Sequence, residues 1–94
     1  MELKDTIEMM QSADYKERFK AEYQQTKIRY EKLKAFNTKI EAAHCTAFKC
    51  VLGVELPKHD CPDELLREQQ RKMGEYLHIL EVRAEIEHID LNSI

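Results

Sequence analysis

Residues 14–40 of the chain are DYKERFKAEYQQTKIRYEKLKAFNTKI, a stretch that contains no Gly and no Pro. Within it, seven positions alternate spacings of four and three residues: Phe19, Tyr23, Thr26, Tyr30, Leu33, Asn37 and Ile40. This alternation is the heptad pattern of a helix that packs along a neighbouring helix. We therefore predict one long helix over residues 15–43. Its seam needs a partner, because propensity alone does not support a helix of that length.

Signals before this stretch set its boundary. Asp14 is followed three residues later by Glu17, which is the spacing of a capping box, so the helix is expected to begin at Tyr15. Nearer the N-terminus, three apolar residues are spaced four and three apart: Leu3, Ile7 and Met10. This spacing predicts a short N-terminal helix over residues 3–11.

A second long helix is predicted over residues 62–88. Pro62 suits the first helical position, where no amide hydrogen is needed, and Asp63 and Glu64 follow it in the first turn. Apolar residues then repeat every seven positions: Leu66, Met73 and Leu80. Further apolar positions widen this face, so the helix is expected to touch more than one neighbour: Tyr76, Leu77, Ile79, Ala84 and Ile86.

A connection over residues 44–61, with turn signals at Gly53 and Pro57, joins the two predicted helices. Helices of nearly equal length on either side of a turn predict an all-α fold. We expect an antiparallel long helical hairpin with a short N-terminal helix, forming a single domain over residues 1–94. Because two helices bury little core, the chain is expected to form a homodimer or higher oligomer through coiled-coil-like seams.

Composition and charge agree with this fold. The 94 residues include two Gly and two Pro, with 15 Lys and Arg against 18 Asp and Glu. Residues 15–40 carry eight basic and three acidic side chains, whereas residues 60–91 carry four basic and nine acidic ones. This segregation favours antiparallel packing, although exposed ion pairs contribute well under ~1 kcal/mol each. The sequence has neither a membrane-spanning stretch nor a signal-peptide pattern, so we expect a cytoplasmic protein without a membrane partner.

Motifs for metal binding and catalysis are missing from the sequence. Soft ligands gather near the connection, but their spacings do not supply the four ligands of a zinc site: His44, Cys45, Cys50, His59 and Cys61. Glu85-x-x-His88 has metal-ligand spacing but occurs once. There is no P-loop, GxGxxG, HExxH or GxSxG. We expect thiols, no metal, no cofactor and no enzymatic activity.

The long basic helix carries the candidate ligand-binding residues. Three tyrosines are interleaved with three cations: Tyr15, Tyr23 and Tyr30 with Arg18, Lys27 and Arg29. Rings that stack on a flat base, beside cations that meet phosphate, are what nucleotide capture needs. Tyrosines at heptad spacing are more often core residues, so both interpretations stay open at this point. The net charge of −3 opposes binding of extended duplex nucleic acid.

Three motifs carry a resemblance to a known family. Residues 3–10 match Leu-Lys-Asp-x-Ile-x-x-Met, and residues 14–30 match Asp-Tyr-Lys-x-Arg-Phe-x-Ala-Glu-Tyr-x-Gln-x-Lys-x-Arg-Tyr. Cys61-Pro62 is followed at residues 73–87 by Met-x-x-Tyr-Leu-x-x-Leu-Glu-x-Arg-Ala-x-Ile-Glu. With these motifs the chain resembles short uncharacterised proteins carried by phages and prophages of gut Firmicutes. The resemblance covers most of the chain except residues 44–59.

The resemblance implies a phage-encoded, non-enzymatic protein that counters bacterial antiviral defence in the cytoplasm of the infected host. The first hypothesis is a homo-oligomer that captures a cyclic nucleotide or ADP-ribose-type immune signal between subunits. Its tyrosines would stack on the ligand and its cations would hold phosphate: Tyr15, Tyr23 and Tyr30, with Arg18, Lys27, Arg29 and Arg83. The alternatives are an anti-CRISPR-like inhibitor of a host defence protein, or a structural coiled-coil module without a ligand.

Overall fold

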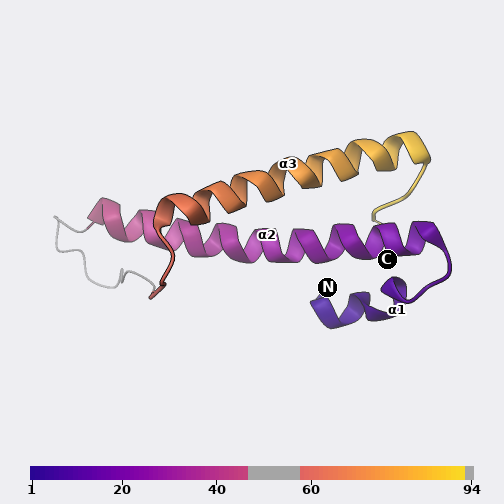
Figure 1. Cartoon of the computed structure of the whole chain (residues 1–94), viewed down its shortest axis with the longest axis horizontal. Helices are drawn as coiled ribbons and strands as arrows, with labels where there is room; N and C mark the ends of the chain where they lie inside the picture. Colours follow the sequence, from indigo (N-terminus) through magenta and orange to yellow (C-terminus); the bar gives the residue numbers. More distant parts are fainter. Residues whose placement is uncertain (47–57, 93–94) are drawn as a thin grey trace.

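The computed structural model describes residues 1–46 and 58–92, and these residues form helices and no strand. The elements are η1 (Leu3–Thr6), α1 (Ile7–Met10), α2 (Tyr15–Thr46) and α3 (Asp63–Glu87). Helices α2 and α3 run antiparallel along each other, and α1 lies beside the first half of α2 (Figure 1). The predicted all-α hairpin is therefore confirmed. The predicted turn at Gly53 and Pro57, and the predicted thiol Cys50, lie outside the described residues.

The start of α2 is capped differently from the prediction. The Asp14 carboxylate accepts a hydrogen bond from the Lys16 amide at 3.0 Å, as expected of an N-cap. The backbone N–H of Asp14 donates to the Ser12 hydroxyl at 3.0 Å, and Glu17 pairs with Lys20 at 3.4 Å instead of reaching back. The Ser12 hydroxyl thus accepts the Asp14 backbone hydrogen bond that Glu17 would accept in a capping box. At its other end, α2 extends to Thr46, three residues beyond the predicted boundary.

The predicted N-terminal helix over residues 3–11 is in fact a single 3-10 turn followed by a single α turn. The Thr6 hydroxyl donates to the Leu3 carbonyl at 2.7 Å, which competes with regular helix hydrogen bonding at the junction. Thr6 is fully buried, and Gln25 of α2 donates to its hydroxyl oxygen at 2.8 Å. A buried polar contact therefore fastens this segment to α2.

Helix α3 is slightly shorter than predicted at both ends. Pro62 is the residue before the helix, with a ψ of 144° and not the helical value expected of the first helical position. At the C-terminal end, His88 adopts a left-handed φ of 57°, which reverses the chain so that the Ile89 amide reaches the Ala84 carbonyl at 2.9 Å. The segment after α3 then crosses back over α2, where Gln24 donates to the Leu91 carbonyl at 3.3 Å.

The core lies where the first half of α2 meets the second half of α3. Its six buried residues are Phe19, Tyr23, Leu77, Leu80, Ala84 and Ile89. Farther along the seam Tyr30 packs over Gly74, where an added Cβ would lie 3.2 Å from the Tyr30 ring. Beyond it, the buried Asn37 amide donates to the Leu66 carbonyl at 3.2 Å and to Gln70 at 2.9 Å. Ile40, the next seam position of α2, is buried again, so Asn37 is a polar contact between apolar parts of the seam.

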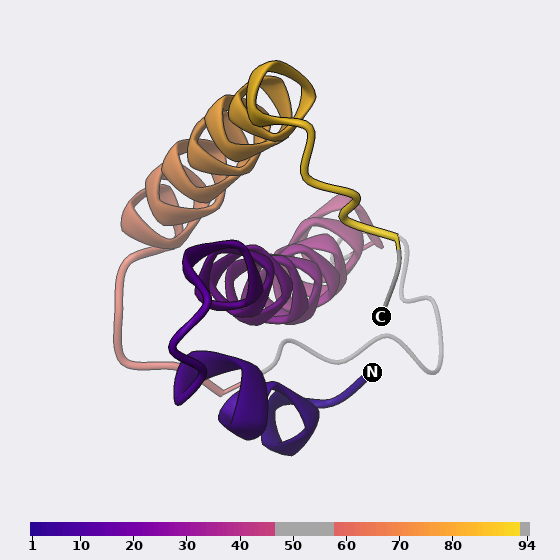
Figure 2. The same cartoon turned by 90° about the vertical axis from the view of Figure 1, so that its right-hand side faces the viewer.

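Helix α2 is the central element, and three other segments surround it. Viewed along the long axis, α3, the N-terminal turns and the C-terminal segment lie on different sides of α2 (Figure 2). The molecule measures 53 × 25 × 22 Å and has a radius of gyration of 17.0 Å. Among residues 1–46 and 58–92, no helix has the length and apolarity that crossing a membrane requires.

The core cluster predicts a strong contrast between two leucines of α3. Leu80 is 1% exposed and Leu65 is 58% exposed. We expect Leu80→Ala to lower the free energy of unfolding by about 2–5 kcal/mol because it leaves a cavity, and Leu65→Ala to change it by less than about 0.5 kcal/mol. Chemical denaturation followed by circular dichroism measures both. Equal losses in the two variants would contradict this placement of the core.

Candidate ligand-binding surface

Three tyrosine–glutamate hydrogen bonds cross between α2 and α3. Tyr15 donates to Glu87 at 2.8 Å, and Tyr23 donates to Glu81 at 2.7 Å. In the third bond the direction is reversed, since Tyr76 of α3 donates to Glu22 of α2 at 2.5 Å. Each hydroxyl bonded to a carboxylate resists losing its proton. The hydrogen bond to Glu87 raises the pKa of Tyr15, and the hydrogen bond to Glu22 raises the pKa of Tyr76.

One side of the hairpin carries all three predicted arginines, Arg18, Arg29 and Arg83. Tyr15, Arg18, Glu22 and Arg29 follow one another at spacings of three, four and seven residues, which places them along one face of α2. The bonds of Tyr15 and Glu22 reach α3 beside this face. We call the combined surface the arginine face; it comprises Tyr15, Arg18, Glu22 and Arg29 of α2 with Tyr76, Arg83 and Glu87 of α3. It lies between α1 and α3, since Met10, Arg18, Glu22 and Gln25 line one open hollow.

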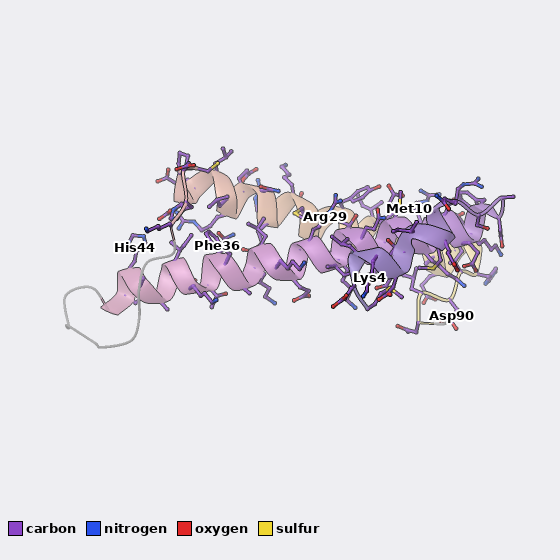
Figure 3. All side chains as sticks on the ribbon, turned by 90° about the horizontal axis from the view of Figure 1, so that it is seen from below. Lys4, Met10, Arg29, Phe36, His44 and Asp90 are labelled. Carbon is purple, nitrogen blue, oxygen red and sulfur yellow. The ribbon has the colours of Figure 1, made fainter. Side chains whose placement is uncertain are left out.

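Figure 3 shows Arg29 and Met10 on one side of α2 and Asp90 on the other. Arg18 donates to the Ser12 carbonyl at 2.8 Å, which holds it near the start of α2. Eleven residues separate Arg18 from Arg29, or about 16 Å of helix. The two arginines therefore share a face but do not converge on one pocket within a single chain.

Three side chains at the end of the arginine face, those of Tyr15, Arg83 and Glu87, are hydrogen-bonded to one another. Glu87 accepts from Tyr15 at 2.8 Å through one oxygen and from the Arg83 Nε at 2.9 Å through the other. Arg83 also donates to the Tyr15 hydroxyl, and its guanidinium lies 4.9 Å from the centre of the Phe19 ring. The bonds from Tyr15 and then Arg83 lower the pKa of Glu87, so its carboxylate stays charged at neutral pH.

The remaining predicted residues, Tyr23, Lys27 and Tyr30, lie on the opposite side of the seam. They line a small hollow of about 240 Å³, where the Lys27 ammonium is 5.8 Å from the centre of the Tyr23 ring. The ring of Tyr23 belongs to the core cluster, and Tyr30 is half-buried against Gly74. These rings are consequently occupied by packing contacts in the hairpin.

Carboxylates dominate that opposite side. Glu31 and Glu81 line the small hollow, and Glu81, Glu85 and Asp90 line an adjoining hollow of about 560 Å³. Lys27 is the one Lys or Arg among the lining residues of these two hollows. The excess of negative charge there opposes a phosphate group. We call this the carboxylate side.

Two histidines meet one carboxylate at the far end of the hairpin. His44 of α2 contacts Asp63 of α3 at 2.8 Å, and His59 contacts its other oxygen at 2.5 Å. These contacts, His59 first, lower the pKa of Asp63. No group of three or more metal-ligand residues within residues 1–46 and 58–92 is arranged to hold a metal ion. The contacts therefore tie the ends of α2 and α3 together.

Sequence reasoning missed the acidic partners of the tyrosines. The prediction gave none of them a tyrosine partner: Glu22 was one of three acids in the basic stretch 15–40, and Glu81 and Glu87 belonged to the acidic excess of residues 60–91. The four-residue spacing of Arg83 and Glu87 was a local signal for their ion pair. The other pairs depend on which turn of α3 lies beside which turn of α2, and heptad spacing leaves that register open.

The Tyr23–Glu81 bond predicts a measurable loss of stability at alkaline pH. Burial, and then Glu81, raises the pKa of Tyr23 to about 12 from an ordinary value of 10.0. The unfolded chain therefore loses this proton first, so the stabilisation is complete below pH 10 and declines as the pH rises toward 12.

We expect Tyr23→Phe to unfold at a lower temperature at neutral pH, by the equivalent of about 1 kcal/mol, and to show a shallower alkaline decline. Thermal melts between neutral pH and pH 12 compare the variant with the wild type. Tyr76→Phe is the comparison: Tyr76 is 40% exposed, so its loss should reduce the alkaline decline less than the loss of Tyr23 does. An identical alkaline decline in wild type and Tyr23→Phe would contradict this assignment.

Comparison with known proteins gives one family. No curated protein and no solved structure shows a significant match to the chain. A family model described as Sequestin matches residues 13–86, which include nearly all of α2 and α3 and every residue of the arginine face except Glu87. That match spans well over half of the 94 residues. The hairpin and the surfaces described above therefore belong to a member of the Sequestin family.

Proposed function

We propose that this protein is a phage-encoded, non-enzymatic binding protein that counters bacterial defence by sequestering a nucleotide immune signal on its arginine face. The name of the family fits a protein that sequesters a ligand. The proposed ligands are phosphate-bearing compounds of the cyclic nucleotide or ADP-ribose type. The sequence resemblance described above is what supports a phage origin.

The observation that carries the proposal is the separation of charge between the two sides of the hairpin. Three arginines and two glutamates lie on the arginine face, and both glutamates already accept bonds from tyrosines. The carboxylate side offers Lys27 among several acids. A phosphate ligand is attracted to the first side and repelled by the second, and arginine binds phosphate through paired hydrogen bonds.

The arrangement also favours capture between two copies of the chain. Arg18 and Arg29 are too far apart to hold one phosphate group together, so a second copy would complete the site. The chain exposes 7081 Å² of surface, whereas a compact monomer of 11.2 kDa exposes about 5,700 Å². The difference exceeds the area that each partner buries in a standard interface, about 800 Å².

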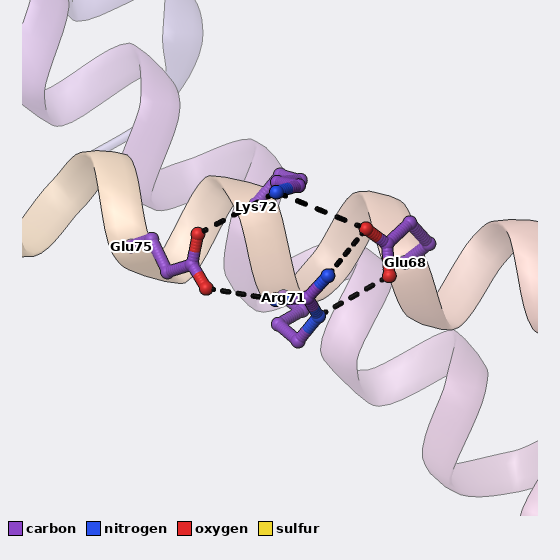
Figure 4. Close-up of polar contacts among 4 residues, drawn as sticks. All are labelled: Glu68, Arg71, Lys72 and Glu75. Atoms are coloured by element: carbon purple, nitrogen blue, oxygen red, sulfur yellow. Dashed lines mark hydrogen bonds and ion pairs between the residues drawn. The ribbon is translucent and has the colours of Figure 1, made fainter.

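The outer face of α3 provides a surface for such a contact. Its first half carries a network of four charged residues, in which Arg71 contacts Glu68 at 2.5 Å and Glu75 at 2.9 Å (Figure 4). Lys72 lies 4.0 Å from both glutamates. The same face continues with three exposed apolar residues: Ile79, Val82 and Ile86. Apolar side chains gathered in this way mark an interaction surface.

The same apolar stripe favours a second candidate function. A protein that inhibits a host defence protein by direct contact would use an exposed apolar face, and Ile86 is 71% exposed. In that case the arginine face would serve as the charged border of a protein interface. The two candidates differ in whether a small molecule alone stabilises the protein.

A ligand screen tests the first candidate. We expect a cyclic dinucleotide, a cyclic trinucleotide or a cyclic ADP-ribose isomer to raise the melting temperature, since a ligand at a hundred times its Kd stabilises by about 2.7 kcal/mol. Arg29→Ala should then weaken binding by about ten- to a hundredfold by removing a charge-assisted contact. Arg67→Ala, an equal change of charge at an exposed position outside the arginine face, should bind normally. No shift with any compound, together with co-purification of a bacterial defence protein, would favour the inhibitor instead.

Light scattering tests the expected self-association. We expect a mass of two or more chains of 11.2 kDa at tens of micromolar, because the apolar stripe of α3 is open in the single chain. Ile86→Glu should yield a monomer with unchanged helix content. A wild-type protein that stays monomeric at this concentration would contradict the oligomer.

A further inference from the structure

In the cluster of Tyr15, Arg83 and Glu87, two side-chain donors bind the two oxygens of one carboxylate. One oxygen of the Glu87 carboxylate accepts from the Tyr15 hydroxyl, and the other accepts from the Arg83 guanidinium. Arg83 and Tyr15 also bond to each other, so the two donors are held as a pair. A guanidinium and a hydroxyl aimed at two oxygens of one anion form the donor arrangement that binds phosphate.

Two further positive contributions act at the same place. The charge of Lys16 lies close enough to lower the pKa of Glu87 along with the larger effects of Tyr15 and Arg83. Tyr15 is the first residue of α2, whose N-terminal end carries the positive end of the helix dipole. The cluster is open to solvent, since Tyr15 is 45% exposed and Arg83 is exposed as well.

Helix α3 by itself does not stabilise the negative charge of Glu87. It is the last residue of α3, where the negative end of the dipole disfavours a carboxylate. In addition, Arg83 precedes Glu87 by four residues, which is the weaker order for a helical ion pair. Its position therefore depends on Tyr15 and Arg83, and a more highly charged anion can replace it there.

We propose that Tyr15 and Arg83 form a binding site for the phosphate group of a ligand, and that the Glu87 carboxylate occupies this site when no ligand is bound. The proposal rests on the proposed function, in that it takes the ligand to be a phosphate compound. Binding exchanges one intramolecular anion for an external one. Glu87 thereby sets a threshold: an anion with a single weak charge does not displace it, and a phosphate group does.

The test compares two equal changes of charge near the end of α3. Inorganic pyrophosphate is titrated into the full-length wild type, Glu87→Gln and Glu85→Gln, and binding is followed by calorimetry and by amide chemical shifts. Glu85 is exposed and lies on the carboxylate side, so its variant reports the effect of charge alone. We expect Glu87→Gln to bind pyrophosphate about two- to tenfold more tightly than Glu85→Gln does. The double variant Arg83→Gln/Glu87→Gln should lose this gain.

Circular dichroism and melting curves establish that each variant is folded. Equal affinity of Glu87→Gln and Glu85→Gln would overturn the proposal, as would a gain that survives the loss of Arg83. The nucleotide screen separates this proposal from the proposed function. If nucleotides fail to bind but the Glu87→Gln gain is found, the phosphate site stands and the nucleotide function falls. If nucleotides bind equally to wild type, Glu87→Gln and Arg83→Gln, this site falls and the nucleotide function stands.

Discussion

The hairpin depends on the contact of Phe19 and Tyr23 with Leu77, Leu80 and Ala84, because this is where α2 and α3 exclude water from each other. This cluster sets the register of α3 against α2, and the other contacts along the seam follow from that register. Once Leu80 lies against α2, Gly74 falls beneath Tyr30, where the backbone approach leaves little room for a side chain. The polar contacts of Asn37 follow from the same register.

This constraint also assigns the roles of the tyrosines. Tyr23 belongs to the cluster and donates its hydroxyl to Glu81 on the carboxylate side, whereas Tyr15 lies at the border of the cluster and is 45% exposed. Glutamates on the facing helix accept all three interhelical hydroxyl bonds. The tyrosines therefore hold the two helices together. Tyr15 differs from Tyr23 and Tyr76 in that an arginine, Arg83, also donates a hydrogen bond to its hydroxyl.

The periodicity of the sequence predicted the two long helices well, but it did not predict which side chains contact each other across them. The alternating spacing from Phe19 to Ile40 was sufficient for α2, and Leu66, Met73 and Leu80 were sufficient for α3. The same spacing could not decide whether Tyr23 or Tyr30 faced the core or a ligand, since both uses place an aromatic ring on the seam. The charge excess of each helix was visible, but its division into two sides depends on the register set by the core cluster.

Local backbone chemistry explains the other differences. The chain reversal after α3 uses His88 at a positive φ, a position where glycine is the usual signal, so the return of Ile89 to the core had no marker in the sequence. The break between η1 and α1 involves the hydroxyl of Thr6, whose role depends on Gln25 of another helix. Both features need tertiary contacts that a single segment does not contain.

The length of α2 has a consequence for the behaviour of the protein in solution. A compact chain of 94 residues has a radius of gyration of about 12 Å, whereas this one has 17.0 Å. A rod tumbles and diffuses more slowly than a sphere of equal mass, so a single chain migrates through a porous matrix like a heavier globule. Elution volume alone would thus mistake one copy for an assembly. The same elongation gives the chain long flanks, along which two copies can lie side by side with their ends free.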